Sequence, residues 1–460
     1  MENGTGLNMA EEFETLDFNS SRLEKRFVKT METLAGQPDK SIWFCSENRA
    51  EAKAIYRMLS NEKLDRKEIL RTHREATIRR MVQSGKTILA VQDTTSLNYN
   101  TQTKMEGIGY IGDKTLGVNI HSCLAVTVDG LILGVLAQAS YNRTQPSNNA
   151  RTHDGKKVRL LEDKESFRWV QTLGESTIDV PEGVHVVTVC DREGDMYELF
   201  DAADREGQAF LIRIVRNRNT IKNEKILDEM RKKRCAGRVE TTIPRDSRRG
   251  LKEREAVLQI RYGSFAIKRP QILNKIKHLG ASQKVNVIYV KEELKSTETA
   301  LEPIEWFLMT NEPVEDDEAA YEKAVWYMRR WKIEQFHYVL KSGCAVEKLQ
   351  ERSMEKTTTL VLMYSIIAAA IMNITYIART NPRLPCTVCF EEDEWKLLYC
   401  TANKTKKPPE KPYTVAEAVT YLSWLGGPRR APSDGPPGVK TIWLGLDKLN
   451  TLLAYKEWLV

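Results

Sequence analysis

Apolar residues recur at three- and four-residue steps through residues 19 to 84, which is the spacing of one face of an α-helix. The segment SSRLEKRFVKTMETLA opens with serines that suit a helix N-cap, and AEAKAIYRML and KEILRTHREATIRRMV continue the pattern. Arginine and lysine occupy many of the polar positions in between. We therefore expect a small helical bundle with basic outer faces.

The pattern changes at Lys86, where short apolar runs rich in β-branched residues begin. Such runs predict buried strands at TILAVQ, which ends at Asp93, at VHVVTVC (184–190) and at QAFLIRIVR. Residues 120–140 read as two strands around a tight Asp129-Gly130 turn. Because helical spacing returns at 166–177 and 195–207, the segment as a whole predicts a mixed α/β sheet.

The pattern differs again from residue 217 to about 300, where basic turns separate short alternating strands such as AVLQIRYG and KVNVIYV. These predict an all-β insertion within the α/β domain. EWFLMT (305–310) then returns to a core strand. The run EAAYEKAVWYMRRWKIEQFHYVLKSG that follows predicts one long helix.

Residues Thr359 to Ala378 carry no charge over nearly twenty positions and are long enough to span a bilayer. A lone span behind a large polar region is one interpretation. A helix buried on all sides in a large protein is the one we favour, because serine, asparagine and threonine interrupt the apolar run. A linker rich in lysine and proline (403–413) and a last helical segment follow, and the polar, acidic start of the chain is unlike a signal peptide. We expect a protein without a membrane partner.

Composition narrows the class of protein. A chain of 460 residues suggests two to four domains, and 29% charged with 41% hydrophobic residues is typical of a soluble globular protein. The net charge of +7 is concentrated: residues 213–254 hold fifteen Lys or Arg against six Asp or Glu. Such a block is either a solvated face or a surface for a polyanion.

The eight cysteines are scattered and fit a reducing compartment. Cys386 and Cys389 form a CxxC pair, which is one half of a structural zinc site. No second pair lies at the spacing of a zinc finger, so we do not expect zinc there.

Two aspartates end predicted strands. Asp93 follows TILAVQ and Asp191 follows VHVVTVC. An aspartate in such a place often only begins a turn. Ligand-binding groups in open α/β sheets nevertheless collect at the carboxyl ends of strands, so the two carboxylates are expected to converge.

The predicted long helix supplies a third carboxylate. At about 100° per residue, Tyr327, Arg330, Glu334 and Lys341 fall within about 60° of arc on one face. An ordinary ion pair four residues apart explains Arg330 and Glu334 but leaves Tyr327 and Lys341 without a reason.

Three carboxylates suit a pair of hard divalent cations, Mg²⁺ or Mn²⁺, and no histidine cluster competes for softer metals. Two such ions activate an attacking oxygen at phosphorus and stabilise the leaving oxygen. Asp93 is the candidate to bridge both ions. Arg330 and Lys341 are candidates to hold phosphates.

The spacing Tyr-x2-Arg-x3-Glu-x6-Lys in YMRRWKIEQFHYVLK resembles the signature of the insertion-sequence-four family of bacterial DDE transposases. VQDTTSLNY and VCDREGDMYELF resemble the two acidic blocks of that family. IGDKTLGVNIHS, FLIR, EWFLMTNEPVE and the tail with YLSWLGG also fit. The resemblance runs from about residue 20 to the end and is weakest in the helical N-terminus.

The resemblance implies a transposon-five-like cut-and-paste transposase. Its core would be a ribonuclease-H-like mixed sheet, with Asp93, Asp191 and Glu334 as the catalytic ligands of two Mg²⁺ or Mn²⁺ ions. Trp306 resembles the aromatic residue that receives a flipped base during hairpin formation, although a tryptophan in a core strand needs no such role. The implied DNA-binding residues are, in full, Tyr327, Arg330, Lys341, Arg213, Trp306, Arg22, Arg26 and Arg57.

The implied organisation is a helical domain at 1–84 that binds transposon-end DNA, a catalytic domain at 85–378 with the β insertion at about 217–300, and helices at 379–460 that dimerise. The partners would be inverted-repeat DNA, target DNA and a second copy of the chain, in the bacterial cytoplasm at the nucleoid. Two alternatives keep the fold: a nuclease without strand transfer, and an inactive DNA-binding derivative of a transposase.

Overall fold

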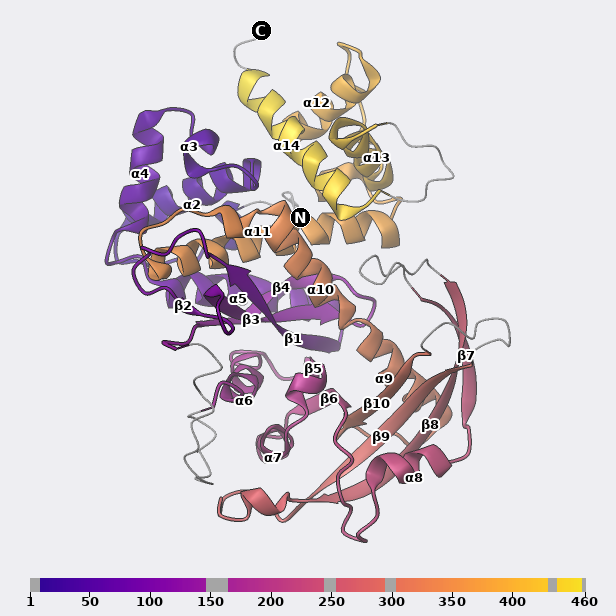
Figure 1. The fold of residues 1–460 in the computed structure, drawn as a ribbon. Coiled ribbons are helices and arrows are strands. Elements are labelled where there is room, and N and C mark those ends of the chain that lie inside the picture. The colour runs from indigo at the N-terminus through magenta and orange to yellow at the C-terminus, as the bar shows by residue number, and fades with distance from the viewer. Residues whose placement is uncertain (1–8, 146–163, 244–253, 294–302, 429–436, 457–460) are drawn as a thin grey trace. The chain divides into compact units, whose positions relative to one another are not determined.

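The protein is described by a computed structural model that covers residues 9–145, 164–243, 254–293, 303–428 and 437–456. Its contacts divide the chain into two compact units. Unit 1 comprises Met1–Gly85, Thr94–Thr152 and Lys332–Val460, and unit 2 comprises Lys86–Asp93 and His153–Trp331. Figure 1 shows the ribbon of both.

The N-terminal part of unit 1 is helical, as the apolar spacing predicts. Its helices are α1 (Met9–Glu12), α2 (Ser21–Gly36), α3 (Ile42–Cys45), α4 (Arg49–Leu59) and α5 (Arg66–Ser84). Local chemistry sets where they begin: Asp65 caps α5 by accepting the N–H of Lys67, and Asn48 caps α4 by accepting the N–H of Glu51. Phe27, Met31 and Leu34 face inward from α2 and are fully buried.

The expected hairpin is also confirmed. Strands β3 (Leu116–Thr127) and β4 (Ile132–Tyr141) pair antiparallel, and Gly130 in the turn has φ +102°. The short β2 (Gly109–Tyr110) pairs with the other edge of β3.

The apolar run of unit 1 forms α11 (Met354–Thr380), which packs on β4. Its Ser365 hydroxyl accepts a hydrogen bond from the Gln138 amide of β4 at 2.8 Å. The helix is long and apolar enough to cross a membrane, but 78% of its most apolar stretch is buried, as in the core helix of a globular protein. The chain then continues into α12 (Glu392–Asn403), α13 (Val415–Gly426) and α14 (Val439–Lys456).

The strands of unit 2 follow the order β1-β5-β6-β10-β9-β8-β7. Strands β1 (Thr87–Asn98), β5 (His185–Cys190) and β6 (Ala209–Ile214) are parallel, and each later neighbour is antiparallel. The later strands are β7 (Gly237–Ile243), β8 (Arg254–Lys268), β9 (Ser282–Glu293) and β10 (Glu305–Thr310).

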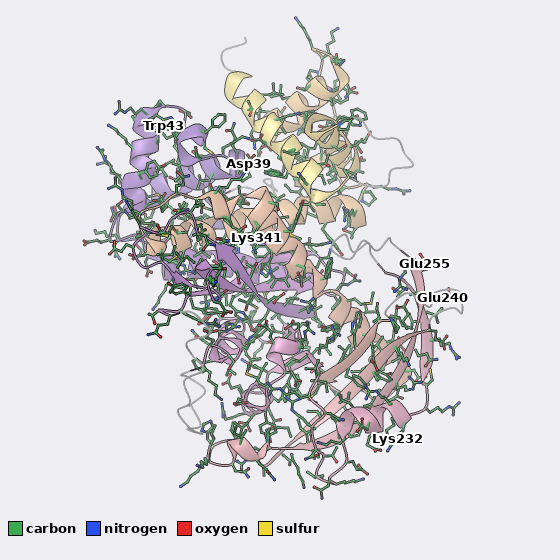
Figure 2. The ribbon with its side chains drawn as sticks, in the orientation of Figure 1. Asp39, Trp43, Lys232, Glu240, Glu255 and Lys341 are labelled. Carbon is green, nitrogen blue, oxygen red and sulfur yellow. The ribbon has the colours of Figure 1, made fainter. Side chains whose placement is uncertain are left out.

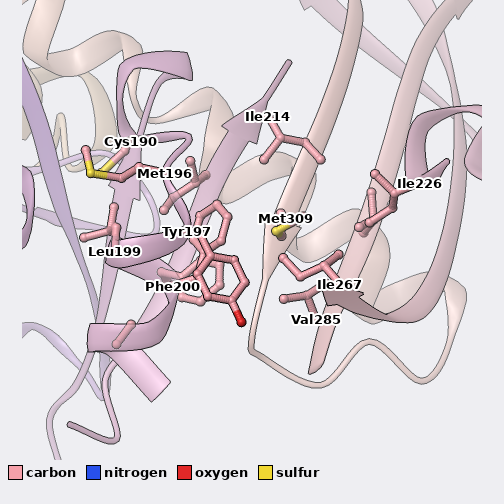
Figure 3. Close-up of a cluster of buried hydrophobic side chains, with 14 of the residues drawn as sticks. Cys190, Met196, Tyr197, Leu199, Phe200, Ile214, Ile226, Ile267, Val285 and Met309 are labelled. Carbon is pink, nitrogen blue, oxygen red and sulfur yellow. The ribbon is translucent and has the colours of Figure 1, made fainter. Parts of the chain in front are cut away.

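Helices α6 (Phe167–Glu175) and α7 (Tyr197–Arg205) contribute to the hydrophobic core of unit 2. Figure 3 shows this core, in which Tyr197 and Phe200 of α7 lie among side chains of β6 and the insertion. Phe200 stacks on Phe210 of β6 with ring centroids 5.2 Å apart. Because alternate strand residues point to opposite faces, Cys190, Ile212 and Ile214 face this core and their neighbours face the other way.

Three expectations need correction. β1 does not end at Asp93 but runs on to Asn98. It continues because Thr94 and Ser96 hydrogen-bond to His121 and Asn119 of β3. The insertion is not wholly β, since it contains helix α8 (Ile226–Lys232). Its strands also extend the core sheet, because β9 pairs directly with β10.

The third correction concerns the long helix. α9 (Asp317–Met328) ends before Arg329, α10 (Trp331–Tyr338) follows, and Val339–Gly343 form a π-helical turn. The N–H groups of Arg329 and Arg330 donate to carbonyls three residues back, which tightens the chain beyond an α-helical turn. The single uninterrupted helix that we predicted is therefore wrong, because α9, α10 and a π-helical turn take its place.

Candidate active site

The register of unit 2 aligns three of the predicted residues. Val91 pairs with Val189 across β1 and β5, and Val189 pairs with Leu211 across β5 and β6. Asp93 and Arg213 lie two residues further along β1 and β6, and Asp191 is the first residue after β5, so the three residues continue this alignment at one end of the sheet. Paired residues in a sheet point to the same face, and parallel strands lie about 4.8 Å apart. The sheet thus carries a row of two carboxylates and one guanidinium, on the face opposite to the core of α7.

The loop after β5 fixes Asp191 locally. Asp191 has an extended backbone, and its Oδ1 accepts the N–H of Glu193 at 2.7 Å. The chain turns back so sharply that a Cβ at Gly194 would lie 2.7 Å from the Cβ of Cys190. A side chain at residue 194 would therefore push the loop off the end of the strand, which explains the glycine of CDREGD.

Arg330 lies against the first aspartate. Its Nη1 is 3.3 Å from Asp93 Oδ2, and both side chains are about 15% exposed. Arg330 comes from the tightened turn after α9, so that turn brings a cation to the carboxylate row. The contact combines charge with limited exposure to water, where such a pair is stronger than on an open surface.

Tyr327 completes the group on this face. Burial raises its pKa to about 12, against the opposing influence of Arg330 and of Arg213, which also hydrogen-bonds the phenol. The phenol is therefore protonated at neutral pH. Trp306 of β10 packs edge-on against the Tyr327 ring, with centroids 5.4 Å apart. Arg213 donates to the Glu305 carbonyl at 3.4 Å, which ties the row to β10.

Glu334 and Lys341 belong to unit 1. Glu334 is half-buried on α10, and Lys341 lies in the π-helical turn that follows (Figure 2). Within the described part of the chain, no group of three or more His, Cys, Asp or Glu side chains gathers closely enough to hold a metal ion. Asp93 and Asp191 do offer carboxylate oxygens, the donor type that Mg²⁺ and Mn²⁺ prefer, so this part of the donor set fits a hard divalent cation.

The three N-terminal arginines lie on helices of unit 1. Arg22 and Arg26 are one turn apart on α2, and Arg57 is near the end of α4. Arg22 and Arg57 are exposed, and Arg26 is half-exposed. Over the described ranges, none of the three forms a salt bridge within 4.0 Å, so their guanidinium groups are available to a partner.

The basic block at 213–254 is partly structural. Several of its cations pair with nearby acids: Arg231 with Asp228 and Glu305, Lys232 with Glu229, Arg238 with Glu293, and Arg254 with Glu292. Lys232 projects from α8 in Figure 2. The pairs of Arg231, Lys232 and Arg238 favour a solvated, internally neutralised face, whereas the Glu292 side chain that pairs with Arg254 is buried. The part at 244–253 lies outside the described residues.

Sequence reasoning missed one contact beside the row. It did not identify Arg218, which forms a buried ion pair with Asp195. Nothing local marks Arg218, because it is one of many basic residues in a basic segment. Only the folded structure brings Arg218 next to Asp195 and so identifies it.

Comparison with known families gives three matches along the chain. A transposase DNA-binding model matches residues 8–64, a transposase DDE domain matches residues 146–371, and a Tn5 transposase dimerisation domain matches residues 366–457. The DDE match contains Asp191 and Glu334 but begins after Asp93.

Among solved structures, the chain is similar to one described as a piggyBac transposase synaptic complex with hairpin DNA. The identity is 10%, the alignment covers 96% of this chain and 73% of the other, and the TM-score is 0.36. That score is too low to bear on the fold.

Proposed function

The chain belongs to the Tn5-like DDE transposases, and from this premise we propose that it catalyses cut-and-paste transposition of an insertion sequence. The reactions would be nicking of a transposon end, hairpin formation and resolution, and joining of the 3′ end to target DNA. The observation that carries the proposal is the register of β1, β5 and β6, which leads Asp93, Asp191 and Arg213 to the same end of three neighbouring strands. Such an arrangement joins two metal-binding carboxylates to a phosphate-binding cation.

The proposed catalytic and metal-binding residues are Asp93, Asp191 and Glu334. DDE domains generally use divalent metal ions, and we propose two Mg²⁺ or Mn²⁺ ions for this chain. When bound, such ions would activate the attacking oxygen and stabilise the leaving oxygen. The Tyr-x2-Arg-x3-Glu-x6-Lys spacing and the match of the DDE model over residues 146–371 support the inclusion of Glu334.

The proposed DNA contacts are argued from the charge of each side chain and from its distance to the carboxylate row. Arg213 and Arg330 lie beside the carboxylate row and would hold the phosphate that is cut, and Lys341 would hold a second phosphate. The Tyr327 phenol accepts a hydrogen bond from Arg213, so its O–H is oriented away from that guanidinium and would donate to a phosphate oxygen. Trp306, half-exposed on β10 beside Tyr327, would stack on a flipped base.

In the proposed reaction order, water first attacks the phosphorus at the transposon end and releases a 3′-hydroxyl. That hydroxyl attacks the opposite strand, which closes a hairpin, and a second water reopens it. The freed 3′-hydroxyl then attacks target DNA. Each step exchanges one oxygen for another at phosphorus, so one set of residues serves all four.

The proposed organisation keeps the three domains predicted from sequence, at 1–84, 85–378 and 379–460. The DNA-binding and dimerisation matches at 8–64 and 366–457 support it. Arg22, Arg26 and Arg57 would grip the inverted repeat, and two subunits would pair two transposon ends. The proposed location is the cytoplasm, at the nucleoid.

The test is Glu334→Ala. We expect cleavage of a transposon-end DNA in Mg²⁺ to fall by at least about 10³-fold, while binding of the same DNA without metal stays within about twofold. Glu322→Ala, an exposed glutamate on the preceding helix α9, is the matched control and should cleave normally. Residual cleavage by the Glu334 variant at the wild-type rate contradicts the assignment. Strand joining by wild-type protein on a precleaved end separates a transposase from a simple nuclease.

A further inference from the structure

The second aspartate of CDREGD forms a buried clamp with Arg218. The Asp195 side chain is fully buried and pairs with Arg218, whose side chain is 6% exposed. Asp195 Oδ2 accepts the N–H groups of Val215 and Arg216, each at 2.9 Å. Arg218 in turn donates to the Asp195 carbonyl at 3.0 Å. The Asp195 carboxylate therefore satisfies three groups of another loop at once.

The clamp connects the two loops that leave the carboxylate row. Asp195 lies four residues after Asp191, in the loop that Gly194 presses onto Cys190. Val215 lies two residues after Arg213, where β6 ends. The contacts between residues 195 and 215 therefore hold the chain that leaves β5 against the chain that leaves β6. Asp191 and Arg213 lie at these same strand ends.

Stability alone is a poor reason for this pair. Removing two charges from water is costly, and apolar residues of similar volume often serve a core as well or better. Burial lowers the pKa of Arg218, and Asp195 opposes that shift. The guanidinium also lies 5.1 Å from the centre of the Phe200 ring. Phe200 itself belongs to the apolar core of unit 2 (Figure 3). The pair supplies directional hydrogen bonds, which apolar side chains lack. Its bonds to two successive N–H groups define the conformation of the loop.

We propose that Asp195 is a positioning residue of the active site, which orients Asp191 and Arg213 through the loops that it clamps. The proposal rests on the proposed function and adds to it a residue that touches neither metal nor DNA. Loss of the clamp should let the Asp191 carboxylate and the Arg213 guanidinium move relative to each other. Displacements of about 1 Å at such a site reduce rates by about 10²-fold.

The chain contains a matched control in Asp201. It is likewise buried, with a side chain 6% exposed, and it likewise accepts a backbone N–H, from Gly280 at 2.7 Å. It also accepts from the Gln283 amide at 2.9 Å. These contacts tie α7 to the loop before β9 and to the start of β9, and neither carries any residue of the row. Asp201→Asn should therefore cost stability without moving Asp191.

The experiment compares Asp195→Asn and Asp201→Asn in the full chain. Three quantities are measured: the melting temperature, the shift of that temperature by Mn²⁺, and cleavage of transposon-end DNA against Mn²⁺ concentration. We expect both variants to melt lower. We expect Asp195→Asn alone to lose most of the Mn²⁺-induced shift, to need at least about tenfold more Mn²⁺ for half-maximal cleavage, and to cleave at least about tenfold more slowly at saturation.

A purely structural Asp195 predicts otherwise: both variants would keep the Mn²⁺ shift and lose cleavage only in proportion to their melting temperatures. That result overturns the proposal. If Asp195→Asn does not fold, the double variant Asp195→Leu/Arg218→Met replaces the buried pair by apolar side chains. Wild-type Mn²⁺ response in the folded double variant also overturns it. If the wild-type protein binds Mn²⁺ but never cuts DNA, the proposed function is contradicted. The shift of the melting temperature by Mn²⁺ then decides by itself whether Asp195 positions the site.

Discussion

At the scale of single residues, the CDREGD segment gives each of its special positions a separate physical role. Asp191 presents a carboxylate at the end of β5, Gly194 permits contact with Cys190, and Asp195 satisfies the N–H groups of the neighbouring loop. Only one of these three, Asp191, is a proposed ligand. The motif therefore contains residues that shape the turn after β5 as well as one proposed metal ligand.

The prediction at this scale concerns Trp306. Base stacking on an aromatic ring contributes about 1–3 kcal/mol, so Trp306→Ala should slow hairpin formation by about 10- to 100-fold while first-strand nicking stays within about twofold. Trp306→Phe keeps a ring beside Tyr327 and should retain most of the activity. Denaturing gels that separate nicked, hairpin and double-strand products report both steps. Equal loss of nicking and hairpin formation in Trp306→Ala would show that the ring has a structural role only.

At the scale of elements, a buried network attaches the short helix α1 to α5 and β4. His73 Nε2 accepts the N–H of Val135 at 2.9 Å, which directs its Nδ1–H to Glu12. Arg80 donates to both Glu12 oxygens, at 2.8 and 3.0 Å, and to the Leu133 carbonyl at 2.7 Å. Burial alone would raise the pKa of Glu12, but His73 and Arg80 together hold it well below its usual value of 4.5.

The prediction for this network is that Glu12→Gln lowers the free energy of unfolding by about 2–3 kcal/mol at pH 7, because Arg80 loses its partner. A carboxyl group whose pKa is lowered by folding stabilises the protein above its unfolded pKa and loses that effect as pH falls. The difference between wild type and variant should thus be full above pH 4.5 and shrink below it. Denaturant titrations at about pH 7, 5 and 4 measure it. Glu14→Gln, an exposed neighbour, is the control, and a difference that grows on acidification would refute the network.

At the scale of the whole molecule, net charge does not explain how DNA would be bound. The chain carries +7, yet the segment matched by the DNA-binding model, 8–64, holds nine Lys or Arg against ten Asp or Glu. Much of the described basic block is paired with acids. If the chain binds a transposon end as we propose, individually placed cations rather than a uniformly basic domain would carry that binding.

The corresponding prediction uses salt. Each phosphate contact adds about 0.9 to the slope of log affinity against log salt concentration. If Arg22, Arg26 and Arg57 each neutralise one phosphate, the triple alanine variant should bind transposon-end DNA with a slope lower by about 3. Replacing the exposed Lys275 and Lys277 of the insertion by alanine is the control and should leave the slope unchanged. Fluorescence anisotropy from about 50 to 300 mM salt measures both, and an unaltered slope in the triple variant excludes these arginines from the interface.

Much of the architecture could be predicted from sequence, because periodicity is a local property. The three- and four-residue spacing gave α2, α4 and α5, the short β-branched runs gave β5, β6 and β10, and Asp129-Gly130 marked the hairpin turn. Each depends on which face of one element is apolar, and neighbours in sequence record that directly. The family resemblance rested on motifs of the same local kind, and the comparisons confirmed it.

What only the tertiary structure decided depends on partners distant in sequence. β1 runs past Asp93 because β3 pairs with it. The chain tightens at Arg329 and Arg330, where regular spacing predicted a continuous helix. The insertion joins the core sheet because β9 pairs with β10. Strand register decides that Asp93, Asp191 and Arg213 come to the same end of the sheet. Burial decides that Asp195 pairs with Arg218. Register and burial are properties of pairs of segments, and no single segment of the sequence records them.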